Sequence, residues 1–208
     1  MCDEMAARAR FNIEAIVERL TAQGFVFHSN DDDRALVVPF RPAGPRGAEA
    51  AGWLESELGP IPLVIESWMR LVGDVWFVGS HPEWDEAAEA DPFVIELEGG
   101  RYANVRIEDY WASEYEAWKE RVAEDATAER FVLPVAPDRL HKSNVSGGEP
   151  YGVRLPDACA DGVFVAEAEV SFVAYLNQVF ANGGFPAQTG GANEAEIKRS
   201  LAAGLLGA

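Results

Sequence analysis

The feature of this sequence that most constrains its fold is a helix–turn–strand unit in residues 59–79, bounded by proline and glycine. Pro62 suits the first turn of a helix over 63–72, because a proline there costs no intrahelical hydrogen bond. Gly73 then ends that helix, and the apolar run VWFVG (75–79) predicts a buried strand. A chain with this unit has to pack helices against a sheet.

Similar signals predict further helices and short strands along the chain. Apolar residues at helical spacing predict helices over 5–22, 48–58, 109–124 and 170–180. Runs rich in β-branched and aromatic residues predict strands over 25–28, 35–40, 92–98, 102–107, 131–136, 151–155 and 163–165. We expect the first two strands to pair through a polar turn, and Pro134 to mark either a strand at a sheet edge or the end of its strand.

The order of these elements lacks the regular strand–helix–strand rhythm of a parallel sheet. We therefore expect an α+β fold with a mixed or antiparallel sheet flanked by helices, in a single domain over residues 1–190. The Gly-rich stretch 183–192 resembles a linker. Residues 191–208 are then expected to be a C-terminal extension that forms a short helix.

The net charge narrows the classes of partner. The chain has 35 acidic residues against 17 lysines and arginines, a formal net charge of −18. Nucleic acids and anionic membranes attract clustered basic residues, so we expect neither as a partner, which leaves a basic protein or a small ligand. No secretory leader or membrane-spanning apolar run is evident, and the two cysteines, Cys2 and Cys159, favour a reducing compartment. We expect a cytoplasmic protein.

Motifs of the common catalytic and cofactor sites are absent from the sequence. It has no phosphate-binding loop, no dinucleotide fingerprint and no nucleophile elbow. Its two distant cysteines cannot make a paired-cysteine zinc site, and no two histidines have one-turn helical spacing. We therefore expect no cofactor, no metal ion and no identifiable catalytic residue.

The first candidate site is the loop 79–86, which follows a predicted buried strand and contains His81 and Trp84. A histidine beside Glu83 and Asp85 could act as a general acid or base. In the structural alternative, the histidine shapes the turn and the tryptophan covers the edge of the core.

The second candidate site is the turn-rich loop 138–151. It gathers the polar residues His141, Lys142, Asn144, Ser146 and Tyr151. The glycines at 147 and 148 allow positive φ, so backbone amides could form an anion-binding concavity beside the lysine. In the structural alternative, these polar side chains cap the backbone of their own loop.

Acidic residues are concentrated in one part of the chain. Residues 83–130 hold 15 acidic and five basic residues, a net charge of −10. Such a patch could attract and hold a basic protein, although a solvated helix and loop would need no partner. The residues expected to contact a partner are Glu83, Asp85, Glu86, Glu114, Glu116, Glu120 and Glu124.

Residues 47–79 resemble the signature region of the SUKH superfamily, the Smi/Knr-like proteins. In that family a helix precedes a Leu/Ile-Pro pair, which opens a second helix that is followed by a Gly-terminated turn and a strand. The matching residues here are Ile61, Pro62, Trp68, Gly73 and Trp76. Asp74 departs from the pattern, because the family often has a second glycine there. Further blocks across 47–186 resemble a group of uncharacterised bacterial proteins.

The resemblance implies an α+β fold, a protein-interaction role and no catalytic residue. Many bacterial members of the family look like immunity proteins that neutralise toxins. The leading hypothesis is therefore a non-enzymatic protein-binding module, of the immunity type, for a basic toxin. The alternative is a small-molecule or anion-binding protein, or an enzyme, whose pocket is formed by the loops 79–86 and 138–151.

Overall fold

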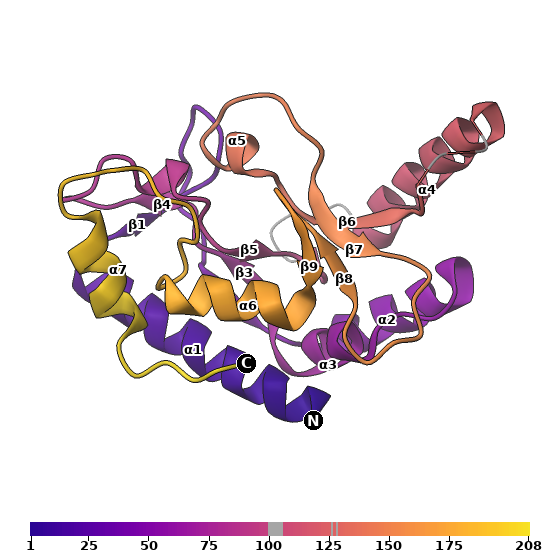
Figure 1. Cartoon of the computed structure of the whole chain (residues 1–208), viewed down its shortest axis with the longest axis horizontal. Coiled ribbons are helices and arrows are strands. Elements are labelled where there is room, and N and C mark those ends of the chain that lie inside the picture. The colour runs from indigo at the N-terminus through magenta and orange to yellow at the C-terminus, as the bar shows by residue number, and fades with distance from the viewer. Residues whose placement is uncertain (100–105, 126, 128) are drawn as a thin grey trace.

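The computed structural model describes residues 1–99, 106–125, 127 and 129–208, in which helices and short strands interleave (Figure 1). Its helices are α1 (Cys2–Ala22), α2 (Pro45–Leu58), α3 (Leu63–Leu71), the 3-10 helix η1 (Ala87–Glu89), α4 (Ile107–Glu124), α5 (Arg139–Lys142), α6 (Phe172–Ala181) and α7 (Glu194–Ala202). Its strands are β1 (Val26–Phe27), β2 (Phe40–Pro42), β3 (Gly73–Trp76), β4 (Gly79–Ser80), β5 (Val94–Ile95), β6 (Val132–Ala136), β7 (Tyr151–Arg154), β8 (Val163–Val165) and β9 (Glu169–Ser171).

The described strands form antiparallel sheets with the orders β1-β4, β2-β3-β5 and β6-β7-β8-β9. Just after β5, the amide of Glu96 donates to the carbonyl of Val135 in β6 at 2.8 Å, which joins the second sheet to the third. As Pro134 predicts, β6 is at the edge of its own sheet. The expected α+β class is confirmed.

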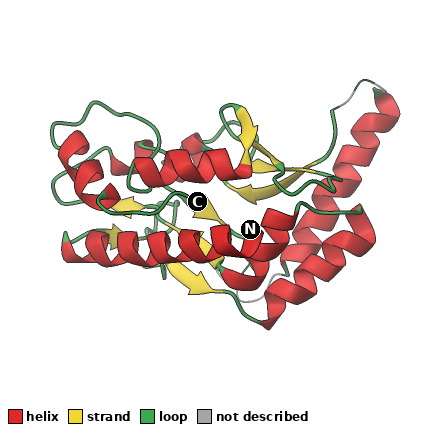
Figure 2. Cartoon of the chain, turned by 60° about the horizontal axis from the view of Figure 1, so that its bottom comes forward, coloured by secondary structure: helices red, strands yellow, loops and turns green. Residues whose placement is uncertain are grey.

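One hydrophobic core connects the helices with the sheets. Trp68 of α3 is fully buried, and its ring meets Phe93 and Phe172 edge-on at 6.1 and 5.4 Å. These two phenylalanines belong to the segment before β5 and to α6. Helix α1 packs against α3, α6 and α7, and in Figure 2 the helices of this side lie in front of the strands. The apolar spacing that predicts these helices thus corresponds to buried faces.

The turn between α3 and β3 shows why glycine and aspartate occupy successive positions. Gly73 has φ +102°, and a Cβ there would lie 2.2 Å from the carbonyl oxygen of Arg41. Asp74, where the SUKH pattern often has glycine, is buried and accepts hydrogen bonds from the amides of Leu97 and Glu98 at 2.7 and 2.9 Å. This carboxylate ties β3 to the residues that follow β5.

The expected pairing of strands 25–28 and 35–40 forms over a single antiparallel bridge, in which the amide of Ser29 donates to the carbonyl of Ala35 at 2.8 Å and that of Val37 to Phe27 at 3.2 Å, but it does not extend into a ladder. Strand β1 pairs with β4, and β2 pairs with β3. The two segments meet only at the isolated bridge between His28 and Leu36. Leu36 and Val38 are 82% and 56% exposed, so this apolar run is not the buried strand that its composition predicts.

Two short elements, α5 and β9, lie where the sequence predicts turns or helix. Both have only three or four residues, too few for a periodic signal. Residues 102–105 of the strand expected over 102–107 lie outside the described part of the chain. The last residue of that expected strand, Ile107, is instead the first residue of α4.

The C-terminal residues pack on the rest of the fold. The stretch expected to be a linker contains Phe185, which is fully buried, and Ile197 and Leu201 of α7 are also buried. Beyond α7 the chain returns to α1, where the buried side chain of Asn12 donates to the carbonyl of Leu206 at 2.8 Å and accepts from its amide at 2.9 Å. The short helix expected after residue 190 is α7, and it shares the core.

Candidate functional site

His81 and Trp84 have structural partners. His81 is buried, with Nε2 3.2 Å from Gln23 Oε1 and Nδ1 accepting from the amide of Glu83 at 3.1 Å. Burial lowers the pKa of His81, although the nearby Glu83 opposes this effect. Trp84 is buried, donates to Thr189 Oγ1 at 3.2 Å and packs edge-on against Phe185. These contacts agree with the structural alternative, in which the histidine shapes the turn and the tryptophan covers the edge of the core.

The loop 138–151 contains a paired carboxylate and imidazole. Asp138 caps α5, accepting from the amides of Leu140 and His141 at 2.7 and 3.3 Å, and its other oxygen pairs with His141 Nδ1. Asp138 is buried, whereas the His141 side chain is 44% exposed. Asp138 begins the loop that the sequence singles out, but its pairing with His141 was not predicted, although an aspartate three residues before a histidine at a helix start is a local signal. Asn144 donates to Asp32 at 2.7 Å, and Ser146 is exposed.

Lys142 and Tyr151 belong to a buried cluster. The ammonium of Lys142 lies 2.6 Å from Asp91 Oδ1 and 4.6 Å from the centre of the Tyr151 ring, and Tyr151 donates to Asp91 Oδ2 at 3.5 Å. Burial lowers the pKa of Lys142, an effect that Asp91 opposes, and burial raises the pKa of Tyr151. Gly148 has φ +83° as expected, but it lies against the Asp138 carboxylate. Because the ammonium of Lys142 is buried and paired with Asp91, it is not available to an anion. The prediction of an anion-binding concavity beside Lys142 is therefore wrong.

The two candidate loops are neighbours, but the cavity at the second loop does not extend to the first. Helix η1, which follows the first loop, packs against α5 of the second. However, a cavity of about 540 Å³ beside α5 includes His141 and Asp138 in its lining but no residue of the described loop 79–86.

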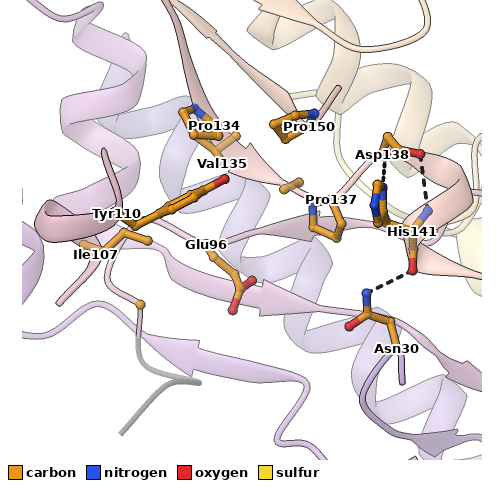
Figure 3. Close-up of a pocket in the computed structure, with 12 residues that line it drawn as sticks. Asn30, Glu96, Ile107, Tyr110, Pro134, Val135, Pro137, Asp138, His141 and Pro150 are labelled. Atoms are coloured by element: carbon orange, nitrogen blue, oxygen red, sulfur yellow. Dashed lines mark hydrogen bonds and ion pairs between the residues drawn. The ribbon is translucent and has the colours of Figure 1, made fainter. Parts of the chain in front are cut away.

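The cavity lies between the start of α4, strand β6 and the loop after β6. Figure 3 shows Tyr110 and Ile107 at one end and Asp138, His141 and Asn30 at the other. The Asn30 side chain donates to the carbonyl of His141 at 2.9 Å. The candidate loop 138–151 contains His141 and Asp138 of this set, whereas Asn30, Ile107 and Tyr110 come from segments far from it along the chain.

The acidic residues expected to bind a partner do not form one surface. In Figure 1, β4, which precedes residues 83–86, is at one end of the molecule, and α4 is at the other. Glu83 and Asp85 are exposed and Glu86 is half-buried. The single patch expected from the charge count is therefore wrong, and the acidic residues of α4 form a separate surface.

Helix α4 projects from the body of the protein (Figure 1). Of its 18 residues, Ile107, Glu108 and Trp111 are buried. Trp111 anchors the helix by stacking on Trp53 at 6.2 Å and donating to the carbonyl of Pro134 at 2.9 Å. The first turn and a half is thus anchored in the core. Farther along the helix, Tyr115 and Trp118 pack against Phe131, and Trp118 Nε1 donates to the carbonyl of Glu129 at 2.8 Å.

The distal half of α4 combines acidic residues with aromatic rings. Glu114 is half-buried, and Glu116, Glu120 and Glu124 are exposed. The ring of Tyr115 stacks on that of Trp118 at 5.4 Å, with both rings half-buried. We define the distal surface of α4 by residues 114–124.

Comparisons with protein-family models, with curated proteins and with solved structures found no match to this chain. In the described residues, no helix is long and apolar enough to span a bilayer. Over the same residues, His, Cys, Asp and Glu side chains do not gather in groups of three that could hold a metal ion.

Proposed function

We propose that this chain is a non-enzymatic protein-binding module that binds a basic protein through the distal surface of α4. The observation that carries the proposal is the projection of this helix, which is buried at only three of 18 residues. Helices in proteins owe most of their stability to a packed apolar face. Within the distal surface, Tyr115 and Trp118 pack against Phe131, and a partner would cover the residues of this surface that stay exposed.

The arrangement of charge supports a basic partner. Glu116, Glu120 and Glu124 are spaced four residues apart, so they share one face of the helix. Like charges at this spacing destabilise a helix by about 0.2–0.5 kcal/mol per pair. The ammonium of Lys119 lies over the Tyr115 ring at 4.9 Å and pairs with Glu116. A basic partner would relieve the repulsion between the glutamates.

The stacked rings of Tyr115 and Trp118 suit the centre of such a contact. Half-buried aromatic side chains carry much of the affinity of protein interfaces, and surrounding charges mainly accelerate association. The resemblance to the SUKH superfamily extends the proposal to its partner, a basic toxin that this chain would neutralise in the cytoplasm. A nuclease toxin fits, since its phosphate-binding cleft is positively charged.

The test first identifies the partner and then measures binding. A photo-crosslinker at Ala117, exposed on α4, is compared in cells with one at Glu196, exposed on α7. The captured protein is purified, and its association is measured with a variant in which Glu116, Glu120 and Glu124 are glutamine. We expect this variant to associate about tenfold more slowly at low salt, and the difference to vanish at high salt.

The matched control replaces the exposed acids Glu18, Glu149 and Glu196 with glutamine, an equal change in net charge away from α4. Circular dichroism verifies that both variants fold. If the two variants associate at the same rate, or if the crosslinker at Glu196 captures the same protein equally well, α4 is a solvated helix and the proposal fails.

A further inference from the structure

Residues 35–39 form an extended segment that bonds to the rest of the protein along one side only. On that side, the carbonyl of Ala35 and the amide of Val37 bond to residues 27–29 at 2.8 and 3.2 Å, and the carbonyl of Pro39 accepts from β3 at 2.8 Å. Successive residues of an extended chain turn their backbone groups to opposite sides. The amides and carbonyls of the two intervening residues therefore face away from β1.

These two residues, Leu36 and Val38, present an open edge to solvent. Among the residues that the structure describes, none forms a hydrogen bond with the amide or the carbonyl of either. Their side chains share one face of the strand and are 82% and 56% exposed, and Val26 of the neighbouring β1 is 48% exposed. An unpaired edge that carries apolar side chains is a template for a strand of another chain.

Carboxylates lie at the N-terminal end of this edge. Asp32 and Asp33 precede it and are exposed, and Asn144 of the loop 138–151 donates to Asp32 at 2.7 Å. The chain as a whole has a net charge of −18. A second copy of this chain would thus be repelled, whereas a basic segment would be attracted to this end of the edge.

We propose that residues 34–38 bind an extended segment of a basic protein, which adds to this edge as an antiparallel strand. The backbone of that segment exchanges hydrogen bonds with Leu36 and Val38, and its apolar side chains cover theirs. Every pair of described strands in this chain is antiparallel, and such pairing is slightly more stable per residue than parallel pairing. An antiparallel segment places its C-terminal end, with its lysines or arginines, beside Asp33.

This edge is separate from the distal surface of α4. It adjoins β1, which in Figure 1 is at the end of the molecule opposite α4. The two surfaces can therefore be tested independently.

The probe is the capped peptide Thr-Val-Thr-Val-Thr-Thr-Lys-Lys, titrated into the full chain and followed by the chemical shifts of the Leu36 and Val38 amides. In the antiparallel register its valines lie opposite these two residues, and its lysines lie opposite Asp33 and Asp32. N-methylation of both valines removes the N–H groups that face the edge and should weaken binding at least about tenfold. N-methylation of the third and fifth residues, whose N–H groups face solvent, should change it less than about threefold. Replacing both lysines with glutamate should weaken binding about tenfold at low salt.

Variants of the chain locate the contact. Leu36→Thr should weaken the peptide about tenfold, because it removes the larger apolar contact. Leu63→Thr, the same change at a residue of α3 that is 50% exposed, should leave binding unchanged. The α4 variant with glutamine at 116, 120 and 124 should bind the peptide within about twofold of the native chain, so a failure at this edge is distinguishable from a failure of the proposed function. Circular dichroism verifies that each variant folds.

Four results would overturn the proposal. They are an absence of peptide binding to the native chain, equal effects of the two N-methylation patterns, and equal losses in Leu36→Thr and Leu63→Thr. The fourth is a dimer of the native chain in sedimentation that Leu36→Thr dissociates, because the edge would then belong to a second copy of this chain.

Discussion

Replacing Glu194 with glutamine tests how α7 is attached to the fold. Glu194 is the first residue of α7, and only 3% of its surface is exposed. Its carboxylate accepts from the amides of Thr189 and Gly190, at 3.0 and 2.7 Å, and from the ammonium of Lys198 at 2.6 Å. The Glu194 side chain therefore holds the loop that precedes α7 against this helix.

The contribution of Glu194 to the free energy of unfolding follows from the pKa of its carboxyl group. Burial alone would raise it, but the hydrogen bonds from Lys198, Thr189 and Gly190 outweigh burial and lower the pKa of Glu194 from 4.5 to about 2. At 1.36 kcal/mol per pH unit, this difference corresponds to about 3 kcal/mol of folding free energy. Because the folded pKa is lowered, the contribution is complete above the unfolded pKa. It falls to about 1 kcal/mol at pH 3 and is nearly lost at pH 2.

The assay is urea denaturation followed by tryptophan fluorescence at pH 7 and pH 3. Glu194→Gln should lower the free energy of unfolding by about 3 kcal/mol at pH 7 and by about 1 kcal/mol at pH 3. Glu196→Gln, an exposed carboxylate in the same turn, should change it by less than about 0.5 kcal/mol. A loss below about 1 kcal/mol at pH 7, or an equal loss at both pH values, would show that the ionised Glu194 carboxylate does not hold α7 to the fold.

Two further pairs of substitutions test the buried ion pair of Lys142 with Asp91 and the close approach of α2 to α3. Asp91→Asn should cost about 3–5 kcal/mol in urea denaturation, because Lys142 would stay buried without its counter-charge, and adding Lys142→Met should recover most of that loss. Gly47→Ala should lower the melting temperature, because its Cβ would lie 2.1 Å from the carbonyl oxygen of Met69. Gly52→Ala, in open space on the same helix, should raise it. Equal shifts for the two alanine variants would contradict the close approach of α2 and α3.

Local signals made the helices predictable. The buried residues of α1 include Ile13, Ile16 and Leu20, which recur every three or four positions, so one sequence window contains the whole pattern. Strand pairing has no such window. β1 pairs with β4, and Val26 lies opposite Ser80. The run 35–40 has a strand-like composition, but nothing in that run indicates that β1 pairs elsewhere.

The candidate sites likewise combine features that are readable from one stretch of sequence with features that only the fold creates. The pairing of Asp138 with His141 is local, so the sequence contains the signal for it. Lys142 has the sequence environment of an exposed loop lysine, and only the fold brings Asp91, 51 residues away, to its ammonium. The cavity combines residues from the start of α4, from β6 and from the segment before β7, so no single stretch could reveal it.

The hydrogen bonds between Asn12 and Leu206 have a consequence for the kinetics of folding. They join residues 194 positions apart, and Arg19 similarly donates to the carbonyl of Leu201, 182 positions away. During synthesis α1 leaves the ribosome before the segment after α7, so the side-chain amide of Asn12 stays without its native partner until Leu206 has emerged. Contacts of such long sequence separation slow folding and leave apolar faces exposed meanwhile. We therefore expect α1 to reach its native packing only after residues 201–206 have been synthesised.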